Sequence, residues 1–222
     1  MEYDVVARAT SERGEVVLCR RGVVHELRVN GVFVMDSAET GSEVELAKAA
    51  LSVVDEPRSV LVGGLGLGFT MHEVLADSRV ERVVVVELEE SIVDWMRDGT
   101  IPHGPGFLAD ERLEVTHGDI RQAVAETAAE TYDLVLLDVD NGPGYLVHEA
   151  NSKVYEQPFL EQVASVTTPG GVLVVWSAAE SVALREAMAA AFGNCEVRKH
   201  PVRLHDRDET YWLYLARRPV LG

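Results

Sequence analysis

The chain has 222 residues, of which 47% are hydrophobic and 26% are charged, a mixture typical of a folded globular domain. A chain of this length buries a large core without disulfides or metals, which excludes a disordered chain and a small disulfide-stapled scaffold. Twenty Lys and Arg residues against 37 Asp and Glu residues give a formal net charge of −17. This charge disfavours nucleic acid and anionic membranes as partners, and it suits either a cationic substrate or solubility alone.

The sequence contains no motif for metal binding, secretion or membrane insertion. Cys19 and Cys195 lie far apart in apolar segments, and the histidines show no ligand spacing. Residues 1–4 lack the basic and apolar regions of a signal peptide, and no apolar run reaches the roughly 18 residues of a membrane span. We therefore expect a cytoplasmic protein with a small-molecule substrate and no metal. Whether it forms a homodimer stays an open question.

Residues 1–55 predict a small antiparallel β unit followed by a helix. The β-branched runs occupy residues 3–9, 15–20, 23–29 and 32–35. Asn30-Gly31 separates the last two runs, and this pair favours a tight hairpin because both residues tolerate positive φ. From Ser42 to Val54 the apolar residues recur at helical spacing, and we place a domain boundary after residue 55.

Residues 56–222 predict an α/β domain with a mostly parallel sheet. The expected strands are 60–62, 83–86, 113–115, 132–137 and 172–176. A helix follows each strand: the first ends near residue 76, and the others span 91–97, 120–129, 154–166 and 180–192. Continuous apolar runs separated by helices indicate a parallel sheet that is buried on both faces. Two further strands, 196–198 and 211–216, have no helix between them, so we expect the last strand to be antiparallel.

A glycine-rich turn follows the first strand of this series. Side chains at Gly64, Gly66 and Gly68 would keep a ligand away from the backbone, and the next helix offers free N–H groups. A tight turn between a strand and a helix also requires glycine, so the motif gains its meaning from its position at the first strand. It is a candidate ligand-binding loop.

Carboxylates end or follow the next two strands. Glu87 ends the second strand, where a carboxylate can accept hydrogen bonds from both ribose hydroxyls of a nucleoside; the alternative is a charged strand end that faces water. Asp119 follows the third strand and is expected to cap the helix from Ile120, to accept from an adenine amine, or both. Adjacent parallel strands end at one edge of a sheet, so together these residues predict a nucleoside site.

The order of these motifs resembles the class I S-adenosylmethionine methyltransferases, and more closely their spermidine synthase branch. The resemblance is carried by Asn30-Gly31-Val32, Glu45, Val60–Gly68, Val83–Glu87, His117-Gly118-Asp119, Tyr132–Asp138 and Pro169-Gly170-Gly171. It implies a Rossmann-like fold and a bound S-adenosylmethionine or decarboxylated S-adenosylmethionine. It also implies a ribose contact at Glu87 and an adenine contact at Asp119.

The chain departs from spermidine synthases at the residues that handle the polyamine. Leu67 stands where their Gly-Gly-Gly-Asp-Gly loop has Asp, and Val34 and Glu43-Val44 stand at their polyamine-contacting Gln and Tyr-His segment. Their Asp-Ser-Ser-Asp-Pro motif keeps its first Asp as Asp138 and has Asn141 at the second. These differences favour methyl transfer, and from the sequence we expect no spermidine formation.

Three residues form the candidate reaction centre. Asp138 ends the fourth strand beside the expected sulfonium, where it would stabilise the cation, contact the cofactor or accept a proton. Asp140 and Tyr145 lie in the following loop, which contains Gly and Pro and is suited to close over a substrate. The alternative is an acidic turn with hydrogen bonds from side chain to backbone.

The leading hypothesis is an S-adenosylmethionine-dependent methyltransferase that acts on a small, cationic acceptor. A divergent polyamine aminopropyltransferase is the alternative, favoured by the negative charge and opposed by the motif differences. A nucleoside-binding protein without catalysis stays open. An NAD-dependent oxidoreductase also stays open, although the Gly-x-Gly-x-Gly spacing and the antiparallel end of the sheet argue against NAD.

Overall fold

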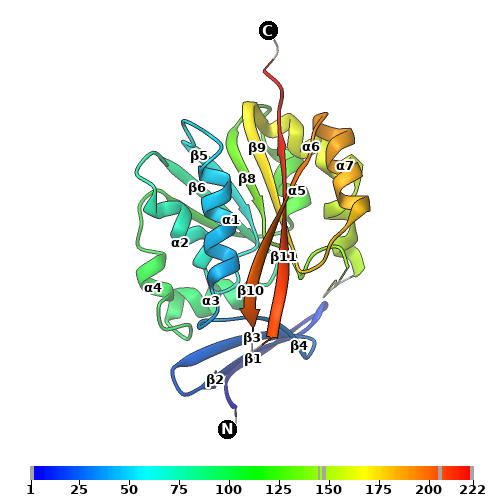
Figure 1. Ribbon diagram of the computed structural model, residues 1–222. Helices are drawn as coiled ribbons and strands as arrows, with labels where there is room; N and C mark the ends of the chain where they lie inside the picture. Colours follow the sequence, from blue (N-terminus) through cyan, green and yellow to red (C-terminus); the bar gives the residue numbers. More distant parts are fainter. Residues whose placement is uncertain (1–2, 145, 147–148, 205–206, 221–222) are drawn as a thin grey trace.

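The computed structural model describes residues 3–144, 146, 149–204 and 207–220, and these residues form two β-sheets (Figure 1). The smaller sheet has strands β1 Asp4–Ser11, β2 Gly14–Arg21, β3 Val24–Val29 and β4 Val32–Asp36, antiparallel and in that order. Asn30 and Gly31 join β3 to β4 with φ values of 52° and 76°, as a tight hairpin turn requires. The predicted N-terminal β unit is confirmed.

The larger sheet has the order β10-β11-β9-β8-β5-β6-β7. Its strands are β5 Ser59–Gly63, β6 Arg82–Glu87, β7 Leu113–His117, β8 Tyr132–Leu137, β9 Thr167–Ser177, β10 Glu196–Leu204 and β11 Arg207–Arg217. Strands β5 to β9 pair in parallel, whereas β11 is antiparallel to both β9 and β10. The mostly parallel Rossmann-like sheet with an antiparallel last strand is therefore confirmed.

Helices cover both faces of the larger sheet (Figure 1). They are α1 Gly41–Leu51, α2 Phe69–Ala76, α3 Glu90–Asp98, α4 Gly104–Phe107, α5 Ile120–Glu126, α6 Gln157–Val166 and α7 Val182–Phe192. Along β5, Val60 and Val62 belong to the core under α1 to α3, whereas Leu61 belongs to the core under α5 to α7. This alternation explains the continuous apolar run, because each of these three side chains is buried on one face or the other.

Helix α1 packs against the larger sheet. It contacts α2 along its length and also meets β8, β9, β10 and β11. Leu46, Ala47 and Ala50 are fully buried on this face. Burial of that apolar face holds the helix on the larger sheet.

Two helical segments differ from the prediction. The short helix α4 was not predicted, because its sequence Gly-Pro-Gly-Phe lacks an apolar period; Pro105 lies in its first turn, where proline is tolerated. The helix predicted from residue 154 begins at Gln157, after a 3-10 segment over Glu149–Tyr155. Pro158 lies in the first turn of α6, which explains the later start.

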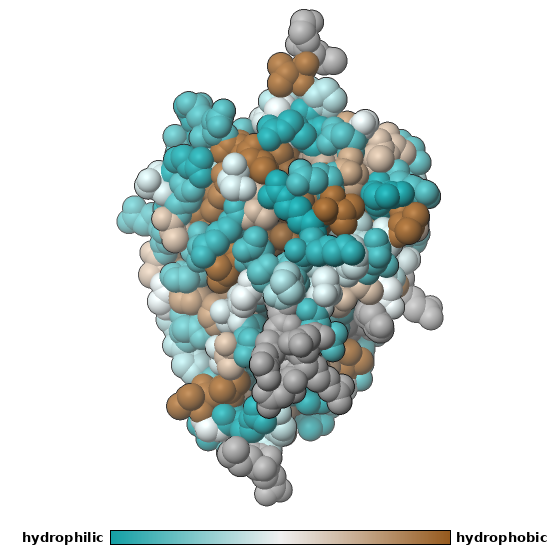
Figure 2. All heavy atoms as spheres, viewed as in Figure 1, coloured by the Kyte–Doolittle hydropathy of each residue, from teal (hydrophilic) through white to brown (hydrophobic). Residues whose placement is uncertain are grey.

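The strand order places a crevice at the carboxyl ends of the parallel strands. From β5 the chain continues to β6 on one side, and β8 pairs on the other, so ligands are expected where these connections diverge. The small sheet lies across this end of the larger one (Figure 1). Hydrophilic side chains cover much of the face seen in Figure 2, and no helix in the described ranges is long and apolar enough to cross a membrane.

Candidate active site

A cavity of about 430 Å³ lies at the carboxyl ends of the parallel strands, between the two sheets. Its lining includes Gly64 and Gly66 after β5, Glu87 at the end of β6, Asp119 after β7 and Asp138 after β8. The volume lies in the range of small-molecule sites. The structure thus brings together the residues that the sequence singled out from four separate strand ends.

Glu87 is 7% exposed and is held by backbone amides. Its Oε2 accepts from the Leu65 N–H at 2.7 Å, and its Oε1 accepts from the Glu89 N–H at 2.8 Å. Burial raises the pKa of Glu87, and these two amides oppose the shift because they stabilise the carboxylate. Glu87 lines the cavity, and the ribose contact stays a prediction.

The glycine loop has positive φ at Gly64, Gly66 and Gly68. A Cβ on Gly64 would lie 2.1 Å from the Asp138 carbonyl oxygen, and one on Gly66 would lie 2.6 Å from the Met35 sulfur. The contact with the Asp138 backbone requires glycine at position 64, and positive φ favours glycine at both positions. Gly68 is not part of the cavity lining; it precedes α2, and a Cβ there would meet Met96 at 2.8 Å.

Asp119 caps α5, as expected. Its Oδ1 accepts from the Arg121 N–H at 2.8 Å, and both of its oxygens also accept from the Arg121 guanidinium. Those bonds lower the pKa of Asp119. Because the carboxylate already serves Arg121, an adenine amine would share its oxygens, and that contact stays a prediction.

Asp138 lies at the cavity with its carboxylate held by helix α2. The Thr70 hydroxyl donates to Asp138 Oδ2 at 2.7 Å, and the Asp138 N–H donates to the Gly63 carbonyl at 2.9 Å. Burial raises the pKa of Asp138, whereas the Thr70 bond lowers it. The side chain thus reaches from the end of β8 to the first turn of α2, and its role as a reaction centre stays a prediction.

The loop after Asp138 reaches the N-terminal sheet. Asp140 lines the cavity with a φ of 54°, and Asn151 donates to its Oδ2 at 2.9 Å. Asn141 also lines the cavity and donates to the Phe33 carbonyl at 3.3 Å. Tyr145 lies outside the described residues, so its expected place at the pocket stays a prediction.

Glu43 is a cavity residue that the sequence did not single out as functional. It lies in the first turn of α1, is 9% exposed, and accepts from the Ser42 hydroxyl at 2.6 Å. Burial and the nearby charge of Asp138 raise the pKa of Glu43 from the ordinary 4.5 to about 7. One signal in the sequence could have identified Glu43: it stands at a position where spermidine synthases have Tyr.

Two aromatic rings form the cavity wall next to Glu43. The ring centres of Trp176 and Tyr211 lie 5.0 Å apart with an interplanar angle of 64°, an edge-to-face contact. Within the described structure the buried Trp176 Nε1–H has no hydrogen-bond acceptor. A buried donor without a partner is uncommon in a folded protein.

The charge of the cavity is strongly negative. Its carboxylate residues are Asp36, Glu39, Glu43, Glu87, Glu89, Asp119, Asp138, Asp140 and Glu209, and its lining among the described residues includes no Lys, Arg or His. At one end of the cavity, Arg13 donates to Glu89 at 2.8 Å and Arg121 pairs with Asp119. The opposite end, at Glu43 and Asp138, is where two neighbouring carboxyl groups repel each other.

This arrangement defines a Rossmann-like domain with an acidic cavity at the carboxyl ends of its parallel strands. The spermine/spermidine synthase domain family matches residues 39–200, and the chain belongs to this family. In structure it is similar to a spermidine synthase in complex with the transition-state analogue AdoDATO, with a TM-score of 0.84 and 14% identity over 98% of this chain and 75% of that one. A spermidine synthase from Thermotoga maritima gives a TM-score of 0.81 at 14% identity over 98% and 73%.

Two kinds of curated enzyme are similar to the chain in sequence. Polyamine aminopropyltransferase 2 of Pseudomonas aeruginosa is 34% identical over 155 residues, or 65% of this chain and 42% of that protein. Putrescine N-methyltransferase 2 of Nicotiana tabacum is 33% identical over 134 residues, or 60% and 35%. The chain thus spans less than half the length of these relatives. The matches favour the spermidine synthase-like alternative over the generic methyltransferase that the motif differences had favoured.

Proposed function

We propose that the protein transfers an aminopropyl group from decarboxylated S-adenosylmethionine to an amine of a small polyamine. The observation that carries this proposal is the acidic cavity with no Lys, Arg or His among its described lining residues. S-adenosylmethionine carries a carboxylate that such a cavity repels, whereas its decarboxylated form carries none. The acceptor is also a cation, so the same field attracts both substrates.

The residues present fit an adenosyl sulfonium compound. In this proposal Glu87 contacts the ribose and Asp119 the adenine, which is supported by their common position in the cavity lining with Gly64 and Gly66. Asp138 lies next to that loop and supplies the negative charge that favours a sulfonium. When bound, the sulfonium provides an activated carbon and a neutral thioether leaving group.

The acceptor end of the cavity suits alkylammonium groups. Trp176 and Tyr211 present aromatic surface, on which a cation is favourable, and Glu39 and Glu43 lie on the same side of the cavity. Transfer between two bound cations depends mainly on holding the reacting nitrogen in line with the carbon–sulfur bond. Carboxylates at this end would offset the repulsion between the two cations.

Methyl transfer to the same acceptor is the second candidate, and two observations favour it. Leu67 is fully buried in the glycine loop, where spermidine synthases have an Asp. The unpaired Trp176 Nε1–H is a donor that a carboxylate would satisfy, and only the undecarboxylated cofactor carries one. These two features oppose the argument from charge, so the choice of cofactor decides between the candidates.

A product assay separates the two candidates. The protein is incubated with putrescine and either cofactor, and the products are identified by mass spectrometry, with Asp138→Asn as the matched variant of unchanged shape. We expect spermidine and methylthioadenosine from the decarboxylated cofactor. N-methylputrescine and S-adenosylhomocysteine would establish the second candidate instead. The absence of product from putrescine, cadaverine and spermidine with both cofactors would contradict both.

A further inference from the structure

We infer that Glu43 is a catalytic residue that accepts the proton of the reacting ammonium, while Asp138 stays ionised beside the sulfonium. This inference rests on the proposed function, because it assigns a role within the acceptor site. Spermidine synthases have a Tyr at the position that matches Glu43. The role assigned to Glu43 is therefore specific to this chain. The evidence lies in the placement of Glu43, in the division of roles with Asp138, and in the charges around the pair.

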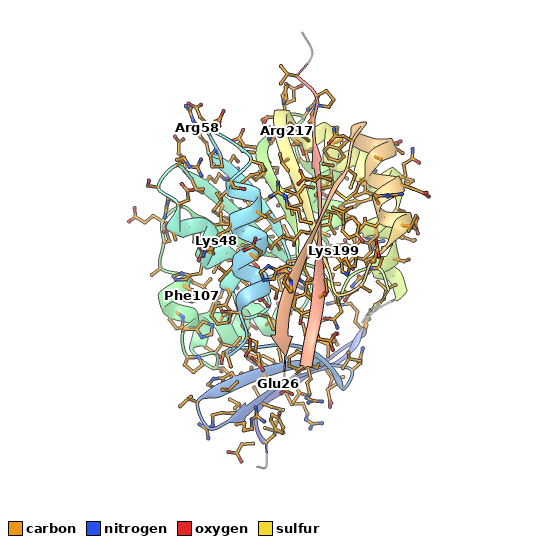
Figure 3. All side chains as sticks on the ribbon, in the orientation of Figure 1. Glu26, Lys48, Arg58, Phe107, Lys199 and Arg217 are labelled. Carbon is orange, nitrogen blue, oxygen red and sulfur yellow. The ribbon has the colours of Figure 1, made fainter. Side chains whose placement is uncertain are left out.

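Helix α1 aims Glu43 into the cavity. Glu43 is in the first turn of the helix and lines the cavity, whereas Lys48, less than two turns later, lies on the exposed side and is 3.8 Å from Glu73 (Figure 3). Burial of Ala47 and Ala50 against the larger sheet fixes the rotation of the helix. The Ser42 hydroxyl then holds one Glu43 oxygen at 2.6 Å. The carboxyl is therefore positioned by the fold, and not by a flexible loop.

Thr70 distinguishes Asp138 from Glu43. Its hydroxyl donates to Asp138 Oδ2 at 2.7 Å, and this bond favours the ionised form of Asp138. Glu43 faces Asp138 from β8, Asp36 from β4 and Tyr211 from β11, and among these groups there is no cation. Two carboxyl groups in such surroundings share one proton in the free protein, and the Thr70 bond to Asp138 favours its place on Glu43.

The pKa of about 7 for Glu43 matches the role of a general base near neutral pH. An approaching ammonium replaces the shared proton, because its charge lets both carboxyl groups ionise. The ionised Glu43 then takes a proton from the ammonium, and the nitrogen gains a free electron pair. That pair forms the new N–C bond while the C–S bond breaks, and the electrons of that bond stay on sulfur as a neutral thioether. The product amine keeps the positive charge, and Glu43 releases its proton to solvent.

Glu43→Gln tests this role, with Glu45→Gln as its matched control. Glu45 lies on the same helix, is not part of the cavity lining, and carries the same charge. For the parent protein and Glu45→Gln we expect kcat/KM to rise with pH below about 7. Glu43→Gln should lose roughly 10²-fold in kcat/KM together with that rising limb, since general-base catalysis contributes on this order. Glu43→Asp, which restores a base, should recover the limb.

A second measurement examines Glu43 without any substrate. In ¹³C NMR of the labelled protein we expect one side-chain carboxyl signal with a midpoint near neutral pH that Glu43→Gln removes and Glu45→Gln keeps. If the parent protein transfers the group and Glu43→Gln keeps both its kcat/KM and the rise of kcat/KM with pH, this inference is overturned. The proposed function would still stand. A parent protein that transfers nothing would contradict the proposed function. A Glu43 signal with a midpoint below pH 5 would overturn the inference in either case.

Discussion

Replacing Glu43 by Gln should stabilise the ligand-free protein at neutral and alkaline pH. Glu43 is 9% exposed, and its pKa is raised from 4.5 to about 7 by burial and by Asp138. A carboxyl whose pKa is higher in the folded state favours folding while it is protonated. That contribution is fully present below pH 4.5 and is lost as the pH rises to 7.

The size of the effect follows from the difference between these two values. At about 1.4 kcal/mol per pH unit, the parent protein loses about 3 kcal/mol of unfolding free energy over this interval, most of it above pH 5. Gln has nearly the same shape and does not ionise, so Glu43→Gln avoids the loss. Removal of the Glu43 charge also favours the ionised form of Asp138, which acts in the same direction.

Urea unfolding followed by tryptophan fluorescence measures this difference at pH 5 and pH 8. The unfolding free energy of Glu43→Gln relative to the parent should increase by about 2 to 3 kcal/mol between the two values of pH. Glu45→Gln reports on the loss of one charge from the same helix and should show little change. A difference between Glu43→Gln and the parent that is the same at both values of pH would refute the reasoning.

Three further substitutions test the cofactor half of the site. Glu87→Gln should weaken methylthioadenosine binding by about 1.5 to 3 kcal/mol, because an amide replaces a charged acceptor; unchanged affinity in calorimetry would remove Glu87 from the site. Gly66→Val should lower the thermal midpoint as well as binding, since its φ is +50° and its Cβ would meet Met35; a variant with parental stability would contradict this steric account. Asp138→Asn should reduce turnover while methylthioadenosine affinity stays within about twofold, and full activity would place the reaction elsewhere.

The sheet could be predicted from the sequence because its strands are buried on both faces. The four valines before Glu87 alternate between the two hydrophobic cores. A continuous apolar segment of this kind, separated by a helix from the next one, indicates a strand of a parallel sheet that is buried on both faces. Helix α4 could not be predicted, because two of its four residues are glycine and its start depends on the packing of Gly104 on Met96. The order of the strands in the sheet does not follow from the hydrophobic pattern.

The candidate site was predictable where a residue lies at a strand end. Glu87 and Asp138 follow apolar runs, and such ends meet at one edge of a parallel sheet. Glu43 could not be recognised in this way, because its meaning depends on the packing of α1 against the larger sheet beside Asp138. The sequence alone also does not show that a Cβ on Gly64 or Gly66 would meet Asp138 or Met35.

Calorimetric titration of the protein with decarboxylated and intact S-adenosylmethionine tests the central claim most directly. The two compounds differ by one carboxylate, and the described lining of the cavity has nine carboxylate residues and no Lys, Arg or His. Repulsion of one further anion predicts that the decarboxylated form binds at least about tenfold more tightly, with a preference that shrinks as salt is added. Equal affinity, or tighter binding of the intact form, would contradict the account and support methyl transfer.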